Sequence, residues 1–171
     1  MKKLLKLFCI TLATLILFSF AGCGALKSPP PLIVKYEDQS IKADRGTTSW
    51  DYHKIGKKWG GFESDSSHPL RWKRETVPSI ILSDDTATPA YVTIDYSTAP
   101  TTLSVTRWSF EIWENKGSDS LSDGEKIELV DGKLPVESGY LYSVYAHWEH
   151  EKYNGIVYYD VFYVISASEV Q

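Results

Sequence analysis

Cysteine is nearly absent from this 171-residue chain, and both of its cysteines, Cys9 and Cys23, lie within the first 23 residues. A domain formed by the residues after Cys23 therefore contains neither a disulfide nor a free thiol. This excludes a disulfide framework and a cysteine nucleophile. Such a domain must draw its stability from the packing of its own apolar side chains.

The sequence also lacks the short motifs that mark common catalytic sites. It contains no Gly-x-Ser-x-Gly nucleophile elbow, no glycine-rich phosphate loop and no His-Glu-x-x-His pair. No spacing of serine, histidine and carboxylate residues selects a triad. We therefore expect no catalytic residue, no cofactor and no enzymatic activity. A hydrolase with a dispersed active site is the alternative.

Long apolar runs are missing except for one, Leu7–Phe20, which follows three lysines within the first six residues. Small residues, Ala21 and Gly22, end the segment. A positive start, an apolar run and a small-residue junction are typical of a secretory signal. The run is shorter than the roughly 20 apolar residues of a membrane-spanning helix. The pattern predicts a signal peptide over residues 1–22.

Cys23 directly follows Ala21-Gly22, and this junction resembles the lipobox of bacterial lipoproteins. Phe20 stands where that family usually has leucine. The resemblance implies that Cys23 is acylated, with palmitate-type chains, and becomes the mature N-terminus. The protein would then be lipid-anchored at the extracytoplasmic face of the cell membrane, where two acyl chains hold it stably. An ordinary secreted protein with a cysteine near its cleavage site is the alternative.

The residues after the lipobox are a proline-rich segment, and with Cys23 they form a predicted tether over residues 23–31. Three successive prolines end it, which favours an extended spacer of about 3.1 Å per residue. Loss of the three signal lysines moves the formal net charge from −4 to about −7. An acidic surface disfavours nucleic acid as a partner and a second, electrostatic membrane contact.

Residues 32–171 have the pattern of a single β-rich domain. Short apolar runs are separated by turn residues, and no amphipathic helix of ten residues or more is evident. Apolar residues alternate with polar ones in 92–96. In 140–148, Tyr140, Tyr142, Val144, Ala146 and Trp148 are expected to share one face, and 156–167 returns as the second half of a long terminal hairpin. We predict an antiparallel, immunoglobulin-like β-sandwich. A small β-barrel is the alternative.

Three local expectations follow from the same pattern. The polar segment 53–69 is expected to be a long loop. Residues 103–113 are expected to form one strand, whose inward face changes between Val105 and Trp108 through a β-bulge at Thr106 or Arg107. In the last strand, one face is expected to carry Val157, Tyr159, Val161, Tyr163 and Ile165.

A second resemblance involves Gly46-Thr47-Thr48-Ser49-Trp50 near the start of the domain and the Gly139–Trp148 run near its end. These elements are similar to uncharacterised envelope domains of Gram-positive bacteria. The likeness spans most of residues 32–168. It implies a fold and a location, and no activity comes with it.

Aromatic residues are abundant, with six tryptophans and eleven tyrosines. Those in or beside the polar segment 51–76 fit a core least well, so we predict a candidate binding surface there. Its members are Trp50, Tyr52, Trp59, Phe62 and Trp72. The alternative is that they fold back as a small core under a long loop.

The best candidate for a metal site is His147 with Glu149, next to His150 and with Asp160 as a conceivable partner across the hairpin. Zinc sites need three or four ligands, so we expect a solvated polar face and no metal.

These features favour a non-enzymatic lipoprotein that binds a protein or glycan of the cell envelope. An accessory or sensor subunit beside a membrane protein is the alternative.

Overall fold

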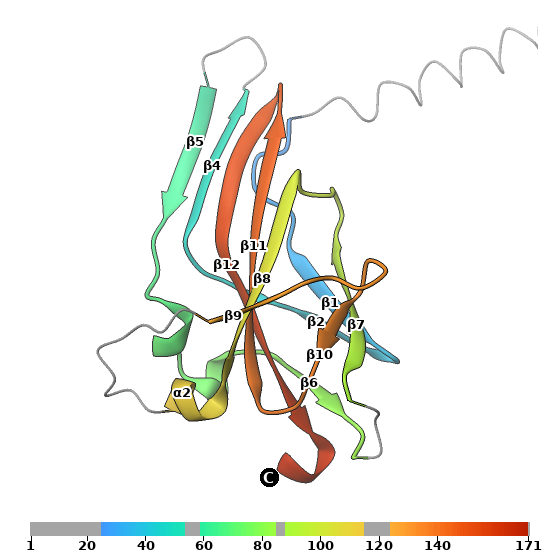
Figure 1. The fold of residues 1–171 in the computed structure, drawn as a ribbon. Helices are drawn as coiled ribbons and strands as arrows, with labels where there is room; N and C mark the ends of the chain where they lie inside the picture. The colour runs from blue at the N-terminus through green and yellow to red at the C-terminus, as the bar shows by residue number, and fades with distance from the viewer. Residues whose placement is uncertain (1–24, 54–58, 85–87, 115–123, 171) are drawn as a thin grey trace, which may run out of the picture.

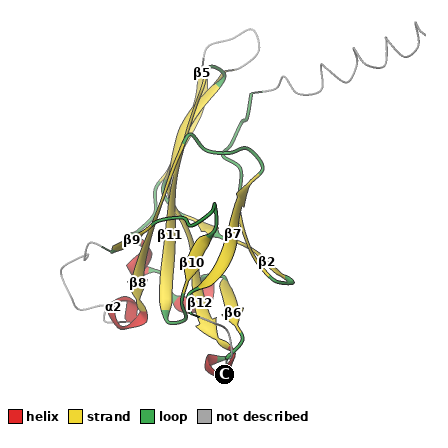
Figure 2. Ribbon diagram, turned by 45° about the vertical axis from the view of Figure 1, so that its right-hand side comes forward, coloured by secondary structure: helices red, strands yellow, loops and turns green. Residues whose placement is uncertain are grey.

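The computed structural model describes residues 25–53, 59–84, 88–114 and 124–170. The predicted signal peptide and Cys23 lie outside these residues. In the described part, two β-sheets pack face to face as a sandwich and do not close into a barrel (Figures 1 and 2). The sandwich prediction is therefore confirmed, and the barrel alternative is wrong. None of the described helices has the length and apolar character needed to span a bilayer.

The smaller sheet has four strands among the described residues. In spatial order they are β10 (Leu134–Val136), β7 (Ala90–Tyr96), β1 (Leu32–Tyr36) and β2 (Gln39–Lys42).

The larger sheet has eight strands in the described part of the chain. Six follow one another in space: β5 (Trp59–Ser64), β4 (Thr48–His53), β12 (Tyr153–Ser166), β11 (Tyr140–His150), β8 (Thr102–Ser109) and β9 (Glu125–Ile127). Two more pair with β12, and they are β3 (Asp44–Arg45) and β6 (Ser79–Leu82). β6 runs parallel to β12, whereas the other pairs are antiparallel.

The chain changes sheets at Ala43, between β2 and β3. The Ala43 amide still bonds to the Leu32 carbonyl of the small sheet, while Asp44 and Arg45 pair with β12 of the large one. The polar pair Asp44-Arg45 is thus a two-residue strand.

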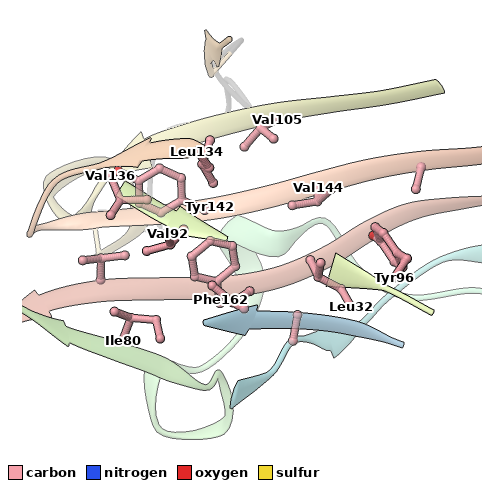
Figure 3. Close-up of a cluster of buried hydrophobic side chains, with 14 of the residues drawn as sticks. Leu32, Ile80, Val92, Tyr96, Val105, Leu134, Val136, Tyr142, Val144 and Phe162 are labelled. Atoms are coloured by element: carbon pink, nitrogen blue, oxygen red, sulfur yellow. The ribbon is translucent and has the colours of Figure 1, made fainter. Parts of the chain in front are cut away.

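The main core fills the space between the two sheets. It consists of side chains that the strands of both sheets direct inward, as the pleat of each strand allows. Figure 3 shows part of this core: Leu32, Ile80, Val92, Tyr96, Val105, Leu134, Val136, Tyr142, Val144 and Phe162. The alternation expected for residues 92–96 is confirmed by their burial. In β11, Tyr142, Val144, Ala146 and Trp148 share the core face as expected, but Leu141 and Ser143 on the opposite face are buried as well.

A second apolar cluster lies on the outer face of the large sheet. Trp108, Leu141 and Val161 contribute from the strands, and Leu70, Val77 and Trp113 cover them. The cover comes from two 3₁₀ turns, η1 (Pro69–Arg71) and η2 (Arg74–Thr76), and from the short helix α2 (Phe110–Glu114) beside them (Figure 1). A last 3₁₀ turn, η3 (Ala167–Glu169), ends the described chain.

This second cluster explains why the inward face of residues 103–113 seemed to change. Val105 faces the inter-sheet core and Trp108 faces the second cluster, so β8 is buried on both faces. Its register with β11 is unbroken from Thr102 to Ser109. The predicted bulge in β8 is therefore wrong, and the predicted strand ends four residues early, where α2 begins.

The bulge lies in β12. Val144 pairs with Asp160 and Ala146 with Val157, so three steps along β12 match two along β11. As a result, Val157 faces the inter-sheet core, whereas Val161 faces the second cluster. The expectation that residues 157, 159, 161, 163 and 165 share one face is wrong for this reason.

Part of the predicted loop 53–69 is a strand. β5 pairs with β4 along its whole length, from Thr48↔Ser64 to His53↔Trp59. As an edge strand with little burial on either face, β5 has no apolar alternation to reveal it. Its glycines suit the pairing, because a Cβ on Gly61 would lie 2.6 Å from the Trp50 carbonyl oxygen.

Candidate binding groove

The five aromatic residues predicted as one binding surface lie in different places. Trp50 is 0% exposed, and its ring packs edge-on against Trp148 and stacks on Tyr153. It belongs to the core because β4 places it on the inner face, opposite Phe62 on β5. Trp50 therefore cannot contribute to a surface.

The remaining four are divided between the two faces of the large sheet. Phe62 is 42% exposed on the inner face, and Trp59 is 53% exposed on the outer face beside His53. Tyr52 is half-buried against the core. Trp72 is half-buried against the second cluster, and its indole N–H donates to the Ser67 carbonyl.

The polar cluster considered for a metal is likewise separated. Asp160 is completely buried on the inner face, where it accepts hydrogen bonds from Arg45 and Tyr96. His147 lies near the Asn154 side chain, 3.3 Å from its Oδ1. Among the described residues, no three histidine, cysteine or acidic side chains are grouped as a metal site would require.

A groove on the outer face of the large sheet offers a better site. Its volume is about 640 Å³, within the usual range of ligand pockets. It adjoins the second apolar cluster, on the part of the sheet that η1, η2 and α2 leave uncovered. The lining residues are His68, Ser104, Thr106, Trp108, Gly124, Lys126, Ser143, Tyr145, Tyr158 and Tyr159.

The β12 bulge supplies two of the aromatic rings in this groove. Tyr158 and Tyr159 are the residues between the pairs Val157↔Ala146 and Asp160↔Val144, so both stand opposite Tyr145. Without the extra residue, consecutive side chains would point to opposite faces. Instead, both line the groove, and Tyr158 meets Tyr145 edge-on with ring centroids 6.1 Å apart.

Hydroxyl groups lie between the rings, and one of them has an unsatisfied hydrogen-bonding capacity. Ser143 is only 4% exposed and lines the groove, yet no described residue gives its hydroxyl a hydrogen-bond partner. A buried polar group without a partner costs about 1–3 kcal/mol. The Ser143 hydroxyl is thus available to a polar group that enters the groove.

His68 forms one wall, and its proton can be placed from its contacts. Its Nδ1 accepts a hydrogen bond from the Leu70 amide at 3.3 Å, so the proton of the neutral ring lies on Nε2. The ring meets Trp108 and Tyr159 edge-on. Burial, and then the nearby charge of Arg71, lower the pKa of His68. The imidazole is therefore neutral at physiological pH and acts as a hydrogen-bond donor.

The groove carries little charge. Lys126 is the one permanently charged side chain in the described lining, which has no carboxylate. Few features of the sequence indicate this site, because its residues are scattered from 68 to 159 and most of them are ordinary for a strand face. The two adjacent tyrosines at 158–159 were the one visible irregularity.

A smaller hollow of about 300 Å³ lies on the other side of the large sheet, between the N-terminal segment and β3. Beside it, the Arg45 guanidinium bonds Asp160 through two nitrogens, each 2.9 Å from a carboxylate oxygen. The Tyr96 hydroxyl donates to the same carboxylate at 2.9 Å. Burial raises the pKa of Asp160, and Arg45 opposes that rise; burial and Asp160 raise the pKa of Tyr96.

Comparison with known proteins yields no match to a protein family, to a curated protein or to a solved structure.

Proposed function

We propose that this protein is a lipid-anchored, non-enzymatic binding module of the cell envelope, and that its ligand is a glycan held in the outer-face groove. The observation that carries the proposal is the make-up of that groove. Aromatic rings from Trp108, Tyr145 and Tyr158 alternate there with hydroxyl groups, among them the buried hydroxyl of Ser143.

Both components match the chemistry of a sugar ring. The C–H faces of a pyranose pack against aromatic rings, whose faces carry partial negative charge. Its hydroxyls need donors and acceptors at close range, and serine, threonine and tyrosine hydroxyls serve as both. His68 adds a donor at the wall. The single lysine, Lys126, also suits a glycan that bears phosphate or carboxylate groups.

A hydrolase is supported less well by the same lining. Glycoside hydrolysis uses two carboxylates that flank the scissile bond, and the described groove residues include none. An envelope protein as partner would bind over a wider and flatter surface than a pocket of this size. Binding without turnover is therefore the function that the groove favours.

The anchor is part of the proposal and has its own test. Mass spectrometry of the native protein should find Cys23 as an acylated N-terminus. Cys23→Ala should leave the protein unprocessed or released from the membrane. Recovery of native protein with an unmodified Cys23 thiol would refute the anchor.

The groove is tested by titrating the soluble domain with peptidoglycan and teichoic-acid fragments and with a glycan array. We expect Tyr145→Ala and Tyr158→Ala each to weaken binding about tenfold or more, because each removes a stacking face. Tyr91→Ala is the matched control, since Tyr91 is a similarly exposed tyrosine on the other sheet. Equal binding by all three variants, or pull-down of a membrane protein with no glycan binding, would refute the proposal.

A further inference from the structure

The N-terminal segment lies along the domain as far back as residue 26. The Leu26 carbonyl accepts a hydrogen bond of 2.9 Å from the indole N–H of Trp50. The carbonyls of Pro29 and Pro30 accept bonds of 2.9 and 2.6 Å from the Arg45 guanidinium. Both prolines are buried, and Leu26 packs against the inter-sheet core. The proline-rich stretch was expected to be a spacer, but these contacts hold it against the protein.

The two donors are themselves fixed. Trp50 is fully buried in the core, and Arg45 is bonded to the buried Asp160. Proline also restricts the backbone before docking, which lowers the entropy lost when the segment is held. Residues 26–30 therefore form a strap that is positioned by the core.

The strap leaves very little free chain between the domain and Cys23. Three residue steps separate Cys23 from Leu26, and an extended chain covers at most about 3.3–3.6 Å per step, or roughly 10 Å. The far end of β4 lies at a similar distance from Trp50, the residue that bonds Leu26. His53 and its partner Trp59 are three residues beyond Trp50, or roughly 10 Å along the strand. Cys23 can therefore reach about as far as the tips of the strands, and no further.

Aromatic residues occupy these strand ends. Trp59 is 53% exposed, and His150 stacks on Tyr153 at 4.6 Å where β11 turns into β12. In Figure 1 the chain leaves the described domain at the end of the molecule where β4, β11 and β12 meet their turns. Tryptophan and tyrosine favour the membrane–water interface because their rings are apolar with a polar edge.

We propose that the strap holds this end of the sandwich against the membrane surface, so that Trp59 contacts the phospholipid headgroup layer. The inference rests on the acylation of Cys23 in the proposed function. It adds that the domain stands in a fixed orientation on the bilayer instead of swinging on a flexible tether.

The test uses the acylated protein in phosphatidylglycerol–phosphatidylcholine vesicles that contain a headgroup spin-labelled phospholipid, which quenches nearby tryptophan. We expect the quenched fraction of the fluorescence to fall at least twofold in Trp59→Phe. Trp72→Phe is the matched control and should leave it unchanged, because Trp72 packs on the second cluster. Both positions are at least partly exposed, so neither change removes a buried ring.

A second variant tests the strap. Ten Gly/Ser residues inserted between Gly24 and Ala25 add a flexible span of about 17 Å, and the same residues appended after Gln171 serve as the control. The insertion should abolish the Trp59-dependent quenching while leaving the protein on the vesicles, and the control should not. If the protein is anchored but its quenching is the same in Trp59→Phe or after the insertion as in wild type, the strap proposal alone is overturned. A protein without acylation would not bind the vesicles at all, which overturns the anchor and this proposal together.

Discussion

Replacement of Arg45 by methionine should destabilise the domain by about 3 kcal/mol at neutral pH. The guanidinium is the only cation that bonds the Asp160 carboxylate among the described residues, and Asp160 is 0% exposed. Its loss leaves a buried charge that keeps one hydrogen bond, from Tyr96. Removal of one partner from a buried ion pair costs about 3–5 kcal/mol. We take the low end because the Arg45 side chain is itself 26% exposed.

This loss should depend on pH in a defined direction. Burial raises the pKa of Asp160, and Arg45 is the main influence that lowers it. In Arg45→Met that opposition is gone, so the folded variant takes up a proton at a higher pH than the folded wild type. The pKa of aspartate in an unfolded chain is about 3.9. When the pKa of a group is higher in the folded than in the unfolded protein, its contribution to the free energy of unfolding decreases as pH rises. The difference in free energy of unfolding between wild type and Arg45→Met should therefore narrow as pH falls from 7 towards 4.5.

Urea unfolding followed by tryptophan fluorescence at pH 7 and pH 4.5 measures both effects. Lys35→Met is the matched control, because Lys35 forms a 2.9 Å ion pair with Asp95 in which both side chains are about half exposed. That pair should be worth about 1 kcal/mol or less. The double variant Arg45→Met/Asp160→Asn removes the unpaired charge and should recover at least half of the loss. Two results would refute the reasoning. One is a loss of stability in Arg45→Met equal to that in Lys35→Met, and the other is a difference between wild type and Arg45→Met that is larger at pH 4.5 than at pH 7.

Two further changes test the packing and the groove wall. Gly155→Ala should cost about 1–3 kcal/mol, because the new Cβ would lie 2.7 Å from the Ser49 carbonyl oxygen and against the Trp50 ring. In Gly132→Ala nothing lies within 4 Å and only the φ of +74° is strained, so unfolding midpoints should show a smaller loss. The pKa of His68 is lower in the folded protein than the value of about 6.5 for histidine in an unfolded chain. Its contribution to the free energy of unfolding is therefore complete above about pH 6.5 and is lost as pH falls. Wild type should lose stability between pH 7 and 5.5 relative to His68→Gln, and parallel pH profiles would contradict this.

The strands that sequence patterns predict well are those with one buried face. β7 is such a strand, because the residues between its core positions are mostly exposed. β11 is an exception: residues 141–144 are buried on both faces, and its inner face could be inferred because Tyr142, Val144 and Trp148 share one parity. This alternation was enough to predict the sandwich. A register and a face can be inferred when only one parity carries the apolar side chains.

The elements that were mispredicted are buried on both faces or on neither. β8 and β12 have apolar residues at both odd and even positions. An alternating pattern therefore does not indicate which face of these strands is the inter-sheet core, or at which residue a bulge exchanges the two faces. β5 is exposed on both faces and has no pattern to detect. Trp50 was misplaced because its neighbours in the chain are polar, whereas its environment is set by Trp148 and Tyr153, about a hundred residues away.

The groove could not be predicted for a related reason. Its floor is formed by β8, β11 and β12, and the tyrosines at 158–159 come together only through the bulge. The predictions for residues 1–23 depend on local motifs and concern a part of the chain outside the described residues.

The groove is built from two kinds of structure, and this affects how its specificity can vary. The floor residues Ser143 and Tyr159 belong to strands whose neighbouring residues support the core, so insertions there would shift the register of the sheet. His68 and Gly124, in contrast, lie just outside the regular elements, where changes in length are well tolerated. Related proteins could therefore acquire new ligands by altering the rim of the groove, with the sandwich left intact beneath it.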